Sequence, residues 1–359
     1  MKKFIGMSLA AAMLLSLTAC GGTTNSGSSG DSSSSSSSGS STTPVEVEYT
    51  EDGDVVVTST EKITLKLAHT NPETSVFHEG AEVFKEEVES MTNGNITVEL
   101  YPSSQLGDSK EIVQSTAMGA VELNISGSAQ FSVFNEELMV LDLPFLFAQR
   151  EVAYEKLDGE PGAYLAEGML DNNIKVLGYL DGGYRCMFNS VRPLNHPSDF
   201  EGLSVRVQDS EVYFNMMDAL GALPSFLPWG DLYVSISQGV VEAGEGGLSQ
   251  LYTQRFYEVA PYVSLTNHTL TINPFVINKD KWDSLPADYQ AVLEVATDRM
   301  EAFERQRMAE AEEESMQLLL DAGVQINEVD AAEFQEAMHP VWDTFAESYG
   351  QDLVDMFAE

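Results

Sequence analysis

Apolar and polar residues alternate in several short segments of the chain, and between these segments apolar residues recur at helical spacing. From about Glu61 onward, this pattern predicts a strand at Ile63–Ala68, a helix at Val76–Met91, a strand at Ile96–Tyr101, a helix at Lys110–Met118 and a strand at Val121–Ile125. Such alternation is typical of βαβ units in a mostly parallel sheet. Ligands bind at the edge where the loops after such strands meet, and this edge would carry His69, Thr70 and Gly127–Gln130.

The same reading continues to the C-terminus. It predicts helices at Gly159–Asp171, Glu211–Leu220, Leu232–Val240 and over most of Ala331–Ala358, and strands at Lys175–Tyr179, Val205–Val207, Thr271–Ile277 and Val324–Asn327. One helix runs from Ala287 to about Ala322, where Gly323 stops it. Its middle is mostly charged or alanine and no heptad repeat is sustained. This indicates a strut that lies across more than one domain rather than a coiled coil.

The first residues read as a targeting segment. Lys2 and Lys3 precede an apolar run that is too short to span a membrane, so residues 1–19 are interpreted as a signal peptide and excluded from the fold. Leu17-Thr18-Ala19-Cys20 resembles a bacterial lipobox, which implies cleavage before Cys20 and lipidation of its sulfur. An ordinary signal peptide with a chance cysteine is the alternative. Several acyl chains would hold the protein extracytoplasmically on the cell membrane.

Residues 20–60 are predicted to be a lipid-anchored linker. Gly21–Thr43 is nearly all Gly, Ser and Thr, a composition that cannot bury a core and behaves as a flexible tether. Pro44–Thr60 is acidic and β-branched, with a short strand expected at Val55–Thr58. Glu51–Asp54 is faintly similar to a calcium loop but lacks the spaced ligands and the terminal glutamate of an EF-hand, so solvated linker is favoured.

Size, charge and rare residues narrow the class of protein. About 300 folded residues exceed the usual size of one hydrophobic core, so two α/β domains are expected. The 18 Lys+Arg and 57 Asp+Glu give a formal net charge of -39, which argues against nucleic-acid binding. With Cys20 lipidated, Cys186 is alone, so neither a disulfide nor a cysteine metal site is expected. The five histidines show no metal-ligand spacing, and no cofactor motif is found.

The candidate chemistry lies in the stretch from Gly182 to Leu251. Although arginines are scarce, Arg185, Arg192 and Arg206 fall close together, and two of them, Arg185 and Arg206, read as the ends of buried strands. A buried guanidinium without a partner is very unfavourable. Either a protein carboxylate satisfies it, as in a structural Arg–Glu pair, or a ligand carboxylate does, which Arg binds in a bidentate manner.

Several ordered motifs carry a family resemblance. They are Tyr101-Pro102-Ser103-Ser104-Gln105-Leu106-Gly107, Leu141-Asp142-Leu143-Pro144-Phe145-Leu146-Phe147, Gly182-Gly183-Tyr184-Arg185, Asp199-Phe200-Glu201-Gly202-Leu203-Ser204-Val205-Arg206-Val207 and Gln238-Gly239-Val240-Val241-Glu242. Together they resemble the solute-binding proteins of TRAP transporters from Lys62 to the C-terminus. The resemblance implies an α/β, two-lobed periplasmic-binding-protein-like fold with hinge strands and a long spanning helix. It places residues 61–182 plus about 271–304 in lobe I, and residues 183–270 plus about 305–359 in lobe II.

The resemblance also implies site residues. Arg206 would pair with a ligand carboxylate, Arg185 would assist, Trp229 would cover the ligand and Glu245 would lie in the cleft. For Trp229, core packing is the alternative. His69 and Gln130, on the sheet edge described above, are further candidate contacts, and a local structural role for His69 is as strong an interpretation. Gly246-Gly247 departs from the Asn and Pro that the family often has, so a side-chain amide is missing.

The function implied is transport rather than catalysis. The protein would capture an organic acid, with a hexuronate as first choice and sialic acid as a second branch, and deliver it to TRAP membrane subunits. A monomer without cofactor or metal is expected. Two other classes remain open: a surface carbohydrate-active enzyme with paired carboxylates, and a sensor or adhesin that presents a ligand.

Overall fold

The structure is a computed structural model that describes residues 47–358. The predicted signal peptide, the predicted lipid attachment at Cys20 and the predicted tether at Gly21–Thr43 lie outside these residues. The strands are β1 (Ile63–Ala68), β2 (Ile96–Tyr101), β3 (Leu123–Ile125), β4 (Ile174–Asn189), β5 (Ser204–Val207), β6 (Leu223–Phe226), β7 (Ala243–Gly247), β8 (Tyr262–Asn278) and β9 (Gln325–Glu328). The α-helices are α1 (Val76–Met91), α2 (Ser109–Ala117), α3 (Ser128–Phe131), α4 (Arg150–Leu157), α5 (Glu160–Glu167), α6 (Glu211–Ala219), α7 (Leu232–Ser237), α8 (Leu248–Thr253), α9 (Lys279–Asp283), α10 (Ala287–Asp321), α11 (Ala331–Tyr349) and α12 (Gln351–Phe357).

One mixed sheet joins the described strands in the order β2-β1-β3-β8-β4-β7-β5-β6, with β9 attached to β8. The pairs at the two ends of this order are parallel, as the βαβ pattern predicts. The prediction of a mostly parallel sheet is wrong at the centre, because β4 is antiparallel to both of its neighbours and β8 is antiparallel to β3. The two central strands are also much longer than predicted, with 16 residues in β4 and 17 in β8.

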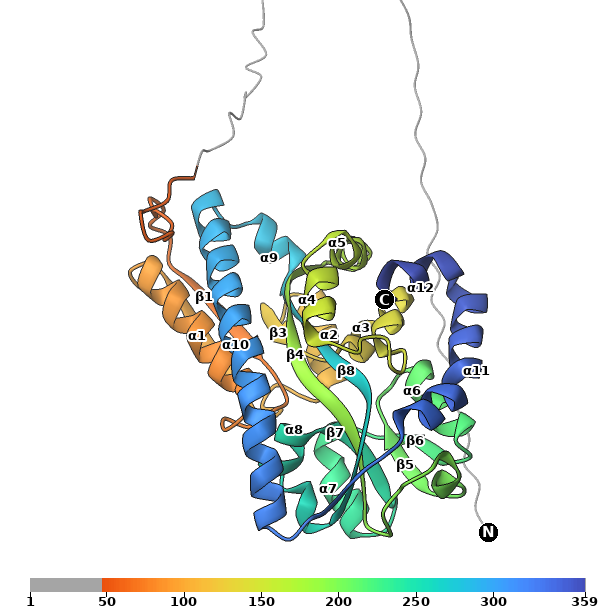
Figure 1. The fold of residues 1–359 in the computed structure, drawn as a ribbon. Helices are drawn as coiled ribbons and strands as arrows, with labels where there is room; N and C mark the ends of the chain where they lie inside the picture. Colours follow the sequence, from red (N-terminus) through yellow and green to blue (C-terminus); the bar gives the residue numbers. More distant parts are fainter. Residues whose placement is uncertain (1–46, 359) are drawn as a thin grey trace, which may run out of the picture. The chain divides into compact units, whose positions relative to one another are not determined.

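The two long strands carry a lobe at each end. β3 pairs with Phe275–Ile277 near the end of β8, whereas β7 pairs with Arg185–Asn189 at the far end of β4. The group β1–β3 and the group β5–β7 are thus attached to opposite ends of one β4–β8 ribbon. Figure 1 shows this ribbon in green and cyan through the centre of the fold. The fold is two-lobed with hinge strands, and the residue limits of each lobe stay a prediction.

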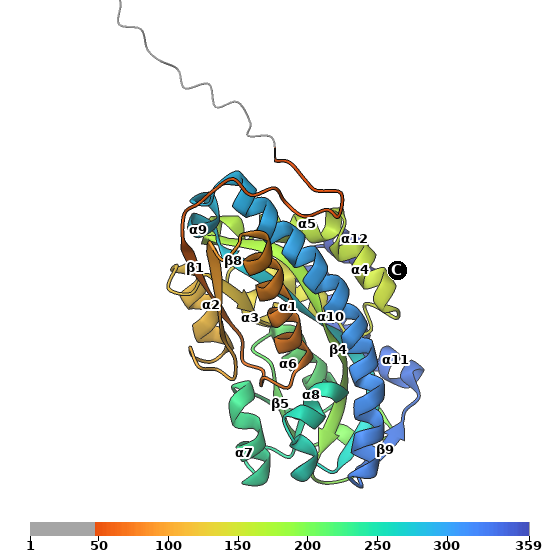
Figure 2. The ribbon, with the colours of Figure 1, turned by 90° about the vertical axis from the view of Figure 1, so that its left-hand side faces the viewer.

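Helix α10 is the predicted long strut. It has 35 residues, and it packs against α1, against β4 and against α8. Figures 1 and 2 show it running along one side of the described fold, beside α1 at one end and beside α8 further along. Val292, Met300 and Met308 belong to the core on the β1 side of the sheet, and Leu319 belongs to the core around Phe188 of β4. A helix that contacts both ends of the ribbon can couple the two lobes.

The remaining differences from the predicted elements have local causes. β7 has the sequence Ala-Gly-Glu-Gly-Gly, which carries almost no strand propensity, yet all five residues are buried between β4 and β5. Residues 47–60 were expected to be linker, but Val55 is buried and the backbone N–H groups of Thr58 and Ser59 each donate to Asp288 of α10, both at 2.8 Å. Within residues 47–358, no helix combines the length and the apolar character needed to cross a membrane.

Candidate functional site

A cavity of about 230 Å³ lies where the strand ends of the two lobes meet. Polar uncharged residues are the largest group in its wall. Ser126, Gly127 and Gln130 come from the end of β3 and from α3, while Thr271 and Asn273 come from β8. The predicted lobe II contributes Arg185, Arg206, Gln208, Trp229 and Gln250. Such a convergence of polar groups from both lobes around one cavity is the usual form of a small-molecule site.

Among the described cations that line this cavity, Arg206 is the one that forms no ion pair with a carboxylate. It lies on β5 and is 4% exposed, and its Nε donates to the Leu227 carbonyl at 2.9 Å. Its guanidinium lies over the Trp229 ring, 5.3 Å from the ring centroid. Nη1 is buried and has no hydrogen-bond partner among the described residues. Burial lowers the pKa of Arg206 to about 10, against the opposing charge of Glu245. A bound carboxylate would remove this penalty.

Arg185 forms an ion pair and hydrogen bonds with other residues of the protein. Its Nε donates to the Glu245 carboxylate, its Nη2 donates to the Glu245 carbonyl at 2.6 Å, and its Nη1 donates to the Thr271 hydroxyl at 3.1 Å. Burial opposes its charge, but Glu245 outweighs burial and holds the pKa of Arg185 above its ordinary value. Of the two alternatives from the sequence, Arg185 forms the structural Arg–Glu pair, whereas Arg206 forms no ion pair with a described carboxylate.

Glu245 lies behind Arg185 rather than in the cavity wall. It is fully buried on β7, and it is not among the residues that line the cavity. Burial alone would raise its pKa, but the charge of Arg185 lowers the pKa of Glu245 to about 2. His268 Nε2 lies 3.6 Å from the Glu245 carboxylate, beyond hydrogen-bond distance, and burial lowers the pKa of this histidine. Glu245 thus holds Arg185 in place.

Trp229 closes one side of the cavity. Its ring meets Phe256 edge to face, with centroids 4.9 Å apart, and its Nε1 is buried without a described partner. Gly246 makes room for this ring, since a Cβ built there would lie 3.1 Å from Trp229 Cη2. The glycine that departs from the family pattern is therefore matched to the indole.

Of the other two predicted contacts, Gln130 and His69, one lines the cavity and the other does not. Gln130 lines the cavity from α3. His69 does not: its side chain is fully buried, and its Nε2 lies 3.1 Å from Nδ1 of His78. Burial and then the neighbouring imidazole lower the pKa of His69 to about 3, so it is a neutral core histidine. Its chain neighbours Thr70 and Asn71 line the cavity instead. The expected edge is correct, but side chains alternate in direction along a strand and His69 points inward.

Several cavity residues were missed from the sequence, and two of them have an unpartnered buried polar atom. Asn273 Nδ2 and Gln250 Oε1 are both buried without a partner in the described part of the chain. Asn273 had a signal that could have revealed it, because it is a lone amide inside the apolar strand Thr271–Ile277. Gln250 follows a glycine-rich strand and carried no such signal. Among the described residues, no group of His, Cys, Asp and Glu has the geometry to hold a metal ion.

The chain is similar to known bacterial solute-binding proteins. Residues 67–348 match the profile of the DctP family, described as "Bacterial extracellular solute-binding protein, family 7". The chain is 32% identical over 299 residues to the C4-dicarboxylate-binding periplasmic protein DctP of Rhodobacter capsulatus, covering 82% of this chain and 90% of that protein.

Two solved structures extend the comparison. A TRAP periplasmic solute-binding protein from Sulfitobacter sp. with bound β-D-galacturonate is 30% identical, with a TM-score of 0.80 over 82% of this chain and 99% of that one. A TRAP periplasmic solute-binding protein from Shewanella oneidensis with bound succinate is 31% identical, with a TM-score of 0.79 over 82% and 98%. The chain described here belongs to this DctP family of bacterial extracellular solute-binding proteins, the solute-binding proteins of TRAP transporters.

Proposed function

We propose that this protein captures an organic acid outside the cytoplasm, holds its carboxylate on Arg206 between the two lobes, and delivers it to the membrane subunits of a TRAP transporter. The observation that carries the proposal is the buried guanidinium of Arg206 with an unpartnered Nη1 in a polar cavity. In a chain with a formal net charge of -39, nearby carboxylates are abundant. An arginine that pairs with none of the described ones is arranged for an anion from outside.

The cavity favours a sugar acid over a short dicarboxylate, although relatives of similar identity hold either kind. A dicarboxylate needs a second cation. Arg185 is occupied by Glu245, and Lys110 at the rim pairs with Asp209 at 2.8 Å. The remaining groups are the amides and hydroxyls of residues such as Gln130, Gln208 and Asn273. This set matches one carboxylate and several hydroxyl groups, so a hexuronate such as galacturonate is the first choice.

Binding would be coupled to closure of the lobes. The cavity takes residues from both ends of the ribbon, so a ligand that contacts all of them is bound only when the lobes are together. We further propose that the protein is a monomer, that it is not an enzyme, and that it is anchored by lipid at Cys20. The lipobox resemblance supports the anchor, and the solute-binding relatives support transport rather than catalysis.

A calorimetric titration panel tests this function. The panel holds D-galacturonate, D-glucuronate, sialic acid, succinate and the neutral sugars galactose and glucose, each titrated into the full chain carrying Cys20→Ser. We expect one hexuronate to bind at least about tenfold more tightly than succinate and the neutral sugars to give no heat, because only the acid pairs with Arg206. Equal binding of an acid and its neutral parent would contradict the proposal, as would release of a shortened product from a uronate oligosaccharide.

A further inference from the structure

The N-terminal part of β4 has a strand neighbour on one side only. β8 pairs with β4 along its whole length, but β7 pairs only with Arg185–Asn189. Within the described sheet, the opposite edge of β4 before Arg185 is therefore open. Its inward N–H groups are nevertheless buried, and buried backbone donors need acceptors.

Three glutamates of α10 supply these acceptors. The Glu301 carboxylate accepts from the Tyr179 N–H, the Glu304 carboxylate accepts from the Asp181 N–H at 3.0 Å, and the Glu312 carboxylate accepts from the Tyr184 N–H at 2.9 Å. In side-chain exposure Glu301 is 13%, Glu304 is 0% and Glu312 is 15%. Helix α10 thus takes the place of a missing strand, with side chains instead of a backbone ladder.

The held segment is the place where the ribbon bends. The pairing of β4 with β8 shifts between Val176 and Gly178 and again between Asp181 and Tyr184. Gly183 lies in the second shift with φ +81°, a conformation that favours glycine. Both contacts need glycine for space as well, because a Cβ on Gly178 or Gly183 would lie within 2.4 Å of Glu301 or Glu312, respectively.

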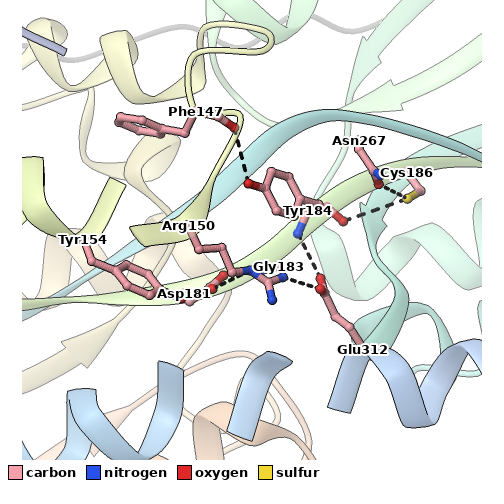
Figure 3. A network of polar contacts seen from close by, with 9 residues as sticks. All are labelled: Phe147, Arg150, Tyr154, Asp181, Gly183, Tyr184, Cys186, Asn267 and Glu312. Carbon is pink, nitrogen blue, oxygen red and sulfur yellow. Dashed lines mark hydrogen bonds and ion pairs between the residues drawn. The ribbon is translucent and has the colours of Figure 1, made fainter. Parts of the chain in front are cut away.

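Arg150 locks this arrangement from the side. From α4 it forms an ion pair with Glu312 and another with Asp181, whose carboxylate lies 3.1 Å from Arg150 Nε, and its guanidinium lies over the Tyr184 ring at 5.1 Å. Figure 3 shows Arg150 between Asp181 of the strand and Glu312 of the helix. Asp181 in turn accepts from the Gly183 N–H at 2.6 Å. Strand, glycine turn and helix are therefore joined through one arginine.

We propose that Glu301, Glu304 and Glu312 are positioning residues for the ligand cavity, which they do not line, because they hold the bend of β4 from behind. The path from the bend to the cavity is short. Arg185 directly follows Tyr184 and bonds Thr271, and a Cβ on Gly182 would lie 2.6 Å from Asn273 Nδ2 and from Thr271 Cβ. Each of these side-chain hydrogen bonds can break separately when the ribbon flexes. Together they therefore set the fraction of molecules in which β4 has the bend required for ligand binding.

The test compares two neighbouring glutamates of α10. Glu312→Met removes the acceptor of Tyr184, and Glu313→Met changes an exposed residue of the same type as the control. Because the binding-competent fraction scales the apparent affinity, Glu312→Met should weaken D-galacturonate binding about 5- to 50-fold and Glu313→Met should not. Glu312→Gln, which keeps an oxygen acceptor, should restore most of the affinity.

A second measurement separates this inference from the proposed function on which its ligand rests. Spin labels at Met118 and Val240, which are 76% and 61% exposed in the two predicted lobes, report the interlobe distance without any ligand. In Glu312→Met the distance distribution should broaden or shift, and in Glu313→Met it should match the parent. Unchanged distances and affinity in a folded Glu312→Met protein would overturn the inference. If the parent binds no acid, the proposed function fails while the distances still test the bend.

A second pair of variants tests the same inference if Glu312→Met does not fold. Should Glu312→Met not fold, Glu301→Met replaces it, with the exposed Glu294→Met as its control. The same distance change is expected for Glu301→Met, and distances equal to those of Glu294→Met would overturn the inference.

Discussion

The two sides of the central ribbon differ in whether their arginines form ion pairs with carboxylates of the protein. On the cavity face, Arg206 forms no ion pair with a described carboxylate, and its buried Nη1 has no partner. On the face toward α10, Arg150 pairs with Asp181 and Glu312, and Arg305 pairs with Asp158 at 2.7 Å and approaches Glu301 at 3.5 Å. In so acidic a protein the paired arginine is the ordinary case. Arg206 is buried without such a partner among the described residues, and this supports the proposal that it receives an anion from outside.

Arg185, on β4, combines features of both cases. It faces the cavity, yet Glu245 satisfies it from behind. A guanidinium saturated by the protein can shape a wall and orient its neighbours but offers little to a ligand carboxylate. The cavity is therefore expected to use Arg206 for charge recognition and Arg185 for framework, and this division of roles can be tested variant by variant.

The largest effect is expected for Arg206→Ala. Without this side chain the ligand carboxylate would be buried unpaired, which costs about 3–5 kcal/mol, or roughly 100- to 1000-fold or more in affinity. Titration calorimetry with D-galacturonate measures the loss. Arg192→Ala is the control, because the Arg192 side chain is exposed, donates to the Asp199 carbonyl and does not line the cavity. Affinity within threefold of the parent in Arg206→Ala would remove Arg206 from charge recognition.

Arg185→Met should instead act mainly on stability. It leaves Glu245 buried without its cation, and breaking a buried pair at one partner costs about 3–5 kcal/mol of unfolding free energy. The double variant Arg185→Met with Glu245→Met removes both charges and should recover most of that loss. Urea unfolding of the two variants measures the difference. If the double variant is as unstable as the single one, Glu245 is not the group that Arg185 neutralises.

The contribution of Glu301 on α10 to protein stability should depend on pH in a defined direction. Burial raises the pKa of Glu301 to about 7, against the charge of Arg305 and the Tyr179 N–H. The groups around it are Asp158, Asp298, Glu304 and Arg305. The folded state then keeps a proton that the unfolded chain releases near pH 4.5, so this contribution to stability falls as pH rises from about 4.5 to 7.

A loss of about 2–3 kcal/mol is expected across that window from this group. Glu301→Gln stays neutral and should flatten the slope, whereas the exposed Glu294→Gln should not. Unfolding free energies at pH 5, 6, 7 and 8 give the comparison. Parallel slopes in Glu301→Gln and the parent would place the pKa of Glu301 near its ordinary value.

Local pattern and long-range placement differ in how far the sequence reveals them. The bounds of α1 and β2 follow from periodicity and stop signals alone, and both agree with the structure residue for residue. β7 could not be found in this way, because Ala-Gly-Glu-Gly-Gly becomes a strand only when β4 and β5 enclose it. The charged middle of α10 gave no sign in the sequence of which glutamates are buried, yet Glu304 is fully buried against β4.

The site shows the same limit. Motif resemblance pointed to Arg185, Arg206 and Glu245 together, but it could not say which arginine Glu245 would occupy, since that depends on the register of β4 against β7. His69 was misplaced by one residue of alternation, with its neighbour Thr70 reaching the cavity in its stead. Which face a side chain takes is decided by packing that involves distant segments.

The smallest effect is expected for Trp229→Phe, which sharpens the account of Arg206 itself. Phenylalanine keeps an aromatic face over the guanidinium but loses the Nε1 donor, which has no described partner. If that donor serves the ligand, affinity for D-galacturonate should fall about 3- to 10-fold, the size of one hydrogen bond. Trp342→Phe is the matched control, since its Nε1 donates to the Pro144 carbonyl at 3.0 Å away from the cavity. It should lower stability and leave affinity unchanged. An equal change of affinity in both variants would mean that Trp229 acts only through packing, so that Arg206 alone would distinguish the acid from its neutral parent.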